Sequence, residues 1–163
     1  MSRLLVIFLF FFIYSCSSFN TEPKYTIRVF AQDSPKILLM PVDIEICELT
    51  LAGMCEPSAS WTQNSRENII TSFEEILNKR NAILKKYNKN EHNDEIIQII
   101  KLHTQIGQEI INNEYGPFEL PTKKEFSWTL GKKVKLLKKK YKSDYAIFIF
   151  FRDQYSSTKR VIY

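Results

Sequence analysis

Apolar and polar positions divide the chain into a short apolar leader, a polar stretch and a region of regular alternation. Residues 4–14 are consecutive apolar residues, preceded by Arg3 and followed by the small residue Ser15. A basic start, an apolar run and a small residue, in that order, are typical of a secretory signal. A bilayer-spanning helix needs about 20 apolar residues, so this shorter run predicts export rather than a permanent membrane helix.

Strands are expected in three places after the polar stretch. Residues 37–40 are continuously apolar between Pro35 and Pro41, as in a buried strand. In residues 43–49 apolar residues alternate with acidic ones, which predicts a strand with one face in water. Residues 145–151 are apolar, β-branched and aromatic throughout, and predict a central strand covered on both faces.

Three amphipathic helices are expected between these strands. Apolar residues recur at helical spacing in residues 63–87, in residues 94–113 and in a third segment that Ser127 caps. The order strand, helix, helix, helix, strand predicts an α/β fold. The expected architecture is a small sheet whose strands, near residues 37–49 and 145–151, are connected by these helices.

Length and charge refine this division without changing it. Residues 1–15 form the expected signal peptide, residues 16–35 a lipid-anchored tether, and residues 36–163 a single α/β domain. A domain of this size can bury one real core. Removing residues 1–15 takes away Arg3 and no acidic residue, so the net charge falls from +5 to +4.

The cysteine at the end of the leader carries the first functional prediction. Residues 13–16, Ile-Tyr-Ser-Cys, resemble the lipobox of bacterial lipoproteins, in which the cysteine is acylated and becomes the N-terminus. The resemblance implies that lipid on Cys16, palmitate included, holds the chain on a bilayer. Ser17 stands where aspartate would be the inner-membrane retention signal of enteric bacteria, so the outer membrane is favoured over the inner. The alternatives are a secreted protein cut near Ser17 or Ser18, or an uncleaved apolar anchor.

Lipidation of Cys16 would leave Cys47 and Cys55 as the other cysteines. An exported protein meets an oxidising compartment, which permits a disulfide between them; the alternative is two unpaired, small apolar residues. No His or Cys ligands stand at zinc-site spacing, so no metal is expected. Nucleophile-elbow, phosphate-loop and metalloprotease motifs are also absent, and neither a catalytic set nor a cofactor is expected. His103, on the apolar stripe of the second helix, is expected to be structural.

The best candidate for a binding edge follows the strand expected at residues 145–151. Arg152, Asp153 and Tyr155 lie just past its end, where α/β folds tend to place ligand sites. Asp43 would emerge at the same edge if the strands are parallel, and could pair with Arg152 or bind the polar backbone of a partner. The alternative is a structural ion pair and turn.

Lysines are concentrated in residues 132–142. On a helix whose other face is apolar they would form a solvated cationic side, which could also rest on anionic lipid headgroups. Nucleic acid is not an expected partner of an exported, membrane-tethered protein, despite the basic isoelectric point.

Four patches together resemble one family. They are residues 37–54, residues 56–57 followed by 61–62, residues 126–131, and residues 144–148 with 152–156. They are similar to a group of proteobacterial lipoproteins without an established activity. At fold level that group resembles the small α/β domain of the curli-secretion lipoprotein and the N-terminal domain of the translocation protein TolB. Its members continue into further strands, so the resemblance implies that residues 36–163 either lack the last strands or close their sheet differently.

These observations predict a non-enzymatic outer-membrane lipoprotein that faces the periplasm and acts as a binding or envelope-assembly accessory. Its expected partners are the lipid bilayer, through acylated Cys16, and an envelope protein. One alternative is an envelope hydrolase that uses carboxylates near Asp43 and Asp153, which requires the two side chains to converge in one pocket. Another is a degenerate, truncated remnant.

Overall fold

The computed structural model describes residues 34–117, 120–122, 125–158 and 160. The expected signal peptide and most of the expected tether, including Cys16, lie outside the described residues. Within them the chain forms a mixed unit of helices and strands, as the α/β prediction requires. None of the described helices is both long and apolar enough to cross a membrane.

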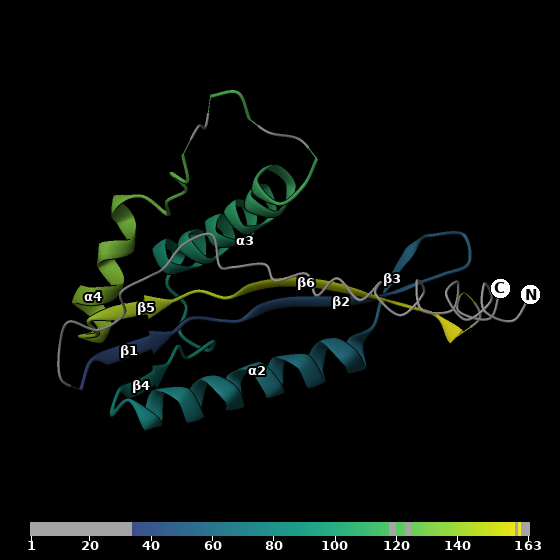
Figure 1. Cartoon of the computed structure of the whole chain (residues 1–163). Helices are drawn as coiled ribbons and strands as arrows, with labels where there is room; N and C mark the ends of the chain where they lie inside the picture. Colours follow the sequence, from purple (N-terminus) through teal and green to yellow (C-terminus); the bar gives the residue numbers. More distant parts are fainter. Residues whose placement is uncertain (1–33, 118–119, 123–124, 159, 161–163) are drawn as a thin grey trace, which may run out of the picture. The chain divides into compact units, whose positions relative to one another are not determined.

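Two parallel segments form the centre of the fold (Figure 1). β1 (Lys36–Leu39) and β2 (Asp43–Leu49) follow one another along the chain, separated by a short break at Pro41. β5 (Tyr145–Ile147) and β6 (Phe150–Ser156) run beside them in the same direction, β5 along β1 and β6 along β2. The bounds of β2 are those that its alternating apolar and acidic residues predicted.

Backbone hydrogen bonds carry the pairing across the breaks between these strands. The amide of Met40 donates to the carbonyl of Ile147, and the amide of Asp43 donates to the carbonyl of Ile149, each at 3.0 Å. The sheets on either side of the break, with strand orders β4-β1-β5 and β3-β2-β6, are therefore continuous.

The prediction that residues 145–151 form a central strand is wrong about its place in the sheet. Within the described residues both of its halves lie at a sheet edge, and the strand continues through Arg152 and Tyr155, which were expected in a loop. Its apolar composition has a simple cause: Ala146 and Phe148 pack on one layer of the core, while alternate residues pack on the other.

β4 (Ile83–Lys86) corrects the expected end of the first helix. α2 (Ala59–Lys79) ends before Asn81, whose φ of 54° is left-handed, and the chain then pairs with β1 as a parallel strand. Leu84 extended the apparent helical pattern because it is also apolar, but it packs on the core from a strand. β3 (Cys55–Pro57), expected as loop, pairs antiparallel with β2.

α3 (Asp94–Glu114) agrees with the expected second helix, and the side chain of Asn93 caps it by accepting from the amide of Ile96 at 3.1 Å. The third helix is shorter than expected. It comprises a single 3-10 turn, η1 (Lys132–Val134), followed by α4 (Lys135–Tyr141). Ser127 therefore caps no helix, because the chain is irregular until after Gly131, whose φ is 73°.

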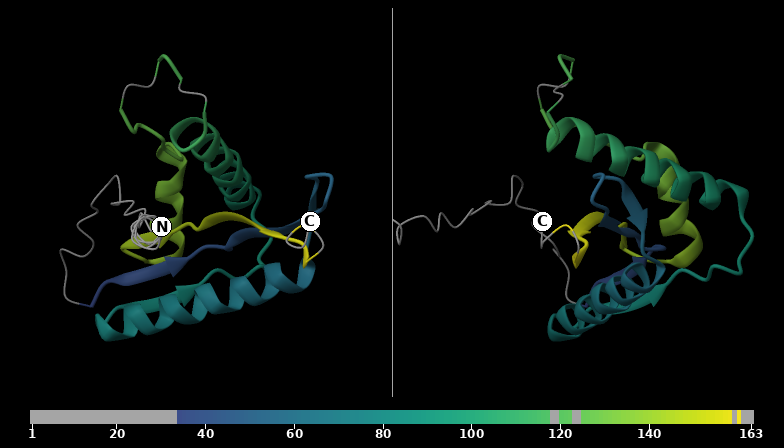
Figure 2. Two further views of the ribbon diagram at one scale, coloured as in Figure 1. Left: turned by 45° about the vertical axis from the view of Figure 1, so that its right-hand side comes forward. Right: turned by 90° about the vertical axis from the view of Figure 1, so that its right-hand side faces the viewer.

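The helices cover both faces of the sheet. Figure 2 shows α2 on one side of the strands and α3 with α4 on the other. The α2 side holds a buried cluster from β1, β2 and their junction: Leu39, Val42, Ile44 and Ile46. The other side holds a second cluster, contributed by β1 with its junction, α3 and α4: Leu38, Met40, Ile96, Ile99 and Leu137. Each helix is thus fixed by its own apolar layer.

Candidate functional site

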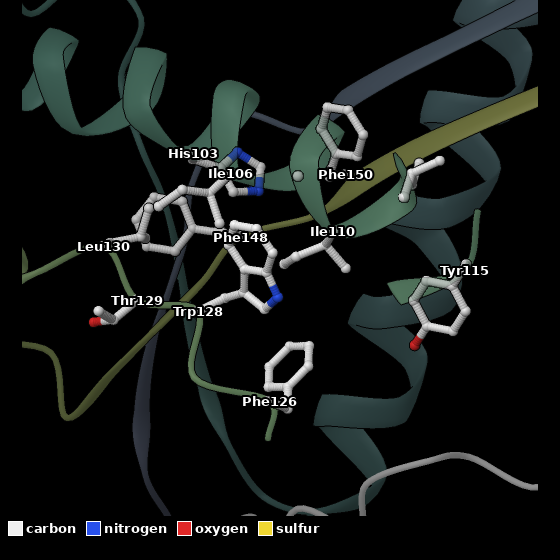
Figure 3. A pocket seen from close by; sticks show the side chains of 12 residues that line it. His103, Ile106, Ile110, Tyr115, Phe126, Trp128, Thr129, Leu130, Phe148 and Phe150 are labelled. Atoms are coloured by element: carbon white, nitrogen blue, oxygen red, sulfur yellow. The ribbon is translucent and has the colours of Figure 1, made fainter. Parts of the chain in front are cut away.

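A cavity of about 370 Å³ opens between α3, the start of β6 and the segment that precedes η1. We name it the α3–β6 pocket. Its lining is mainly aromatic and aliphatic: His103, Ile106, Gly107, Ile110, Ile111, Tyr115, Phe126, Trp128, Thr129, Leu130, Phe148 and Phe150. Figure 3 shows the rings of Trp128 and Phe148 beside Ile106 and Ile110 of α3, with the rings of Phe126 and Phe150 on either side of them. Its volume falls in the range of ligand pockets.

Gly107 sets the distance between α3 and β6. A Cβ atom at this position would lie only 2.3 Å from the ring of Phe150, so no larger residue fits without moving the ring. The aromatic ring therefore rests directly on the helix backbone. This contact forms the inner wall of the pocket, while Ile106 and Ile110, on the same helical face, remain only partly buried.

The outer wall of the pocket exposes large apolar groups to solvent. Tyr115 is 68% exposed and Phe126 is 39% exposed. Trp128, two residues after Phe126, is partly buried, and its indole nitrogen donates to Oε1 of Glu114 at 2.9 Å. Aromatic groups gathered at the mouth of an apolar cavity are typical of binding surfaces.

Beside the pocket, a polar cluster links the sheet to α3. Nη2 of Arg152 lies 2.7 Å from Oδ1 of Asp43, and Oγ1 of Thr104 donates to Oδ2 of Asp43 at 2.5 Å. The guanidinium of Arg152 also stacks over the ring of Phe150, 3.9 Å from its centroid. Because both oxygens of Asp43 are engaged within the fold, the cluster joins β2, β6 and α3 as a structural element.

His103 lies between the polar cluster and the pocket. It is 8% exposed, and its ring centroid lies 5.1 Å from that of Phe148. Burial lowers the pKa of His103 below its ordinary value, and Arg152 lowers it further, while the charge of Asp43 opposes both effects. A neutral imidazole on an otherwise apolar wall suits a pocket that binds apolar groups.

The expected binding edge is divided between the two faces of the sheet. Asp43 and Arg152 form the ion pair on the α3 side. Asp153 and Tyr155 alternate to the α2 side, where the ring of Tyr155 lies 4.8 Å from that of Trp61. Side chains on successive strand residues point to opposite faces, so these four residues cannot form one site. By the same alternation Asp43 and Asp153 point to opposite faces of the sheet, whereas the hydrolase alternative requires them to converge in one pocket.

A disulfide joins Cys47 of β2 to Cys55 of β3, with the Cα atoms 5.4 Å apart. It closes the antiparallel hairpin and lies beside Arg152 and Ile111 in a smaller cavity of about 260 Å³. The covalent link thus stiffens the sheet at the end where β6 passes under α3.

The pocket itself was not predicted from the sequence. Trp128 is expected in the helix that Ser127 caps, and Phe148 and Phe150 in a strand covered on both faces. The one available signal was Gly107, a lone glycine inside an amphipathic helix, which often marks a close packing contact. Within the described residues no group of three or more His, Cys, Asp or Glu side chains is placed to hold a metal ion.

Comparisons with protein-family models, with curated proteins and with solved structures found no match to this chain.

Proposed function

We propose that the chain is a lipid-anchored outer-membrane lipoprotein that faces the periplasm and binds an apolar segment of another envelope protein in the α3–β6 pocket. The observation that carries this proposal is the pocket: a preformed cavity of about 370 Å³ with a mainly apolar lining and exposed aromatic rings at its mouth. The proposal agrees with the sequence resemblance to envelope lipoproteins, and it assigns no catalytic step.

The chemistry of the lining supports binding rather than turnover. His103 is the buried titratable residue of the pocket wall. Its pKa is lowered, and its ring faces aromatic rings. Asp43, the carboxylate whose charge acts on His103, is held by Arg152 and Thr104. A polypeptide is the favoured occupant because exposed aromatic residues around a small cavity provide anchor sites for protruding apolar side chains.

The anchor is tested by membrane fractionation of wild type beside Cys16→Ala. Acylated Cys16 predicts that the wild type sediments with outer membranes and that the variant is released or remains an unprocessed precursor. A variant that is processed and stays as membrane-bound as wild type would show that lipid at Cys16 is not the attachment.

Binding at the pocket is tested by placing a photoreactive residue at Tyr115, which is exposed at the mouth, and at Gln105, which is exposed on the opposite side of α3. Irradiation of intact cells is expected to give a discrete cross-linked species from position 115 and none from position 105. Equal yields from both positions would contradict a partner at this pocket.

A further inference from the structure

A stripe of four lysines runs along α4. Lys135, Lys138 and Lys139 stand at positions i, i+3 and i+4 of α4, so they share one side of the helix. Lys142 follows directly as the C-cap residue, with a left-handed φ of 52°, and all four lysines are exposed. The other side carries Leu137, which is 1% exposed and belongs to the core. The lysine stripe therefore faces solvent in a fixed direction.

In the part of the chain that the structure describes, the side-chain contacts that hold α4 in place involve none of the four stripe lysines. Lys140, which lies off the stripe, forms an ion pair with Glu91, and among the described residues this is the ion pair in which α4 takes part. The hydroxyl of Tyr141 donates to Glu91 at 2.7 Å, and Nζ of Lys85 donates to the carbonyl of Tyr141 at 3.2 Å. The four stripe lysines thus keep their positive charge while the helix beneath them is anchored.

The stripe ends where the expected tether enters the domain. The amide of Asp144, just past α4, donates to the carbonyl of Lys36 at 2.7 Å, and the amide of Lys36 donates to Oδ2 of Asp144 at 2.9 Å. Lys36 is the first residue after the expected tether, residues 16–35. Figure 1 shows α4 beside the starts of β1 and β5. Further exposed basic residues, Lys79 and Arg80, end α2 just before β4, which starts beside Pro35.

We propose that the lysine stripe rests on anionic phospholipid headgroups of the membrane that holds Cys16, and so orients the domain on that membrane. This inference rests on the lipid anchor of the proposed function and adds a second contact to it. A connection of twenty residues can extend at most about 70 Å, so an anchor at Cys16 would keep α4 within that distance of the surface. Each lysine near an anionic surface favours the bound state by about fivefold.

The test uses the full lipidated chain, reconstituted into vesicles of phosphatidylcholine alone or with added phosphatidylglycerol. A membrane-impermeant acetylating reagent modifies exposed amines, and mass spectrometry gives the rate for each lysine. The stripe lysines are expected to react about fivefold more slowly on the anionic vesicles, and this protection is expected to disappear in high salt. Lys101, which is exposed on α3, serves as the internal reference.

Equal rates for the stripe lysines on both vesicles would overturn the proposal and leave an acidic protein as the remaining candidate for the stripe. A chain that washes off both vesicles would contradict the anchor at Cys16 and this inference with it. A chain that stays bound with an unprotected stripe would contradict this inference alone.

A matched pair of variants sharpens the result. Lys138→Gln and Arg160→Gln each remove one positive charge from an exposed position, the first on the stripe and the second beside Thr50 at the end of β2. The first is expected to lower the protection of Lys135 and Lys142, while the second leaves it unchanged. An equal loss of protection in both variants would show that the effect depends only on net charge, and would contradict a specific role for the stripe.

Discussion

The two halves of α3 carry the same pattern of isoleucines but meet different surroundings. In the first half Ile96 and Ile99 are buried at 0% and 2% exposure, against Leu38 of β1 and Leu137 of α4. In the second half, Ile106 and Ile110 line a cavity. Helical spacing decides which face of a helix turns inward, whereas the segment lying opposite decides whether that face becomes core or pocket.

The largest effect is expected from truncating the buried half. Ile96→Ala should lower the free energy of unfolding by about 3 kcal/mol, because it leaves a cavity in a closed core. Ile110→Ala, at the pocket, should cost less than about 1 kcal/mol, because its side chain already borders open space. Chemical denaturation of both variants measures the difference. Similar losses for the two would remove the distinction between core and pocket.

Removing the disulfide should have the next largest effect. Cys47→Ala with Cys55→Ala is expected to lower the free energy of unfolding by about 2.5 kcal/mol, the loop-closure term for a crosslink spanning eight residues. Added reductant should destabilise the wild type to a similar degree and leave the variant unaffected. A reductant effect of equal size in the variant would show that the stabilisation has another source.

Filling the contact between α3 and β6 should cost about 1–2 kcal/mol. Gly107→Ala places a methyl group where the ring of Phe150 now lies, so the ring must move. Gln108→Ala, an exposed neighbour, should change stability by less than about 0.5 kcal/mol. Adding Phe150→Leu to Gly107→Ala should recover part of the loss; simple additivity of the two substitutions would argue against a direct contact.

The smallest effect concerns pH. Because the pKa of His103 is lower in the folded state than its ordinary value of 6.5, the unfolded chain binds the proton more readily. Its contribution to stability is therefore complete above that value and declines as the pH falls below it. Thermal melts between pH 8 and 5 should show a shallower decline for His103→Gln than for wild type or for His92→Gln, whose histidine is exposed. Identical slopes would contradict the lowered pKa.

Local patterns predicted much of the fold. Alternation gave the bounds of β2, and Asn93 marked the start of α3. Errors arose where one pattern served two structures. Leu84 continued a helical spacing from within a strand, and the helix expected directly after Ser127 begins only after Gly131.

The candidate site was harder to predict than the fold. The pairing of Asp43 with Arg152 follows from parallel strands, as anticipated, but Asp153 and Tyr155 separate from them because residues 152–156 form a strand rather than a loop. The pocket depends on rings such as Trp128 failing to close the space beside α3. That is a property of tertiary packing, which no local pattern contains.

The binding role of the pocket is tested most directly by the cross-link yield from a photoreactive residue at Tyr115 in chains that carry Ile110→Asp or Gln105→Asp. Both variants add one negative charge to α3, inside the pocket in the first and on the opposite exposed side in the second. Occupation of the pocket by an apolar segment predicts that the adduct is lost in the Ile110→Asp chain and retained in the Gln105→Asp chain. An adduct of undiminished yield in the folded Ile110→Asp chain would contradict that role.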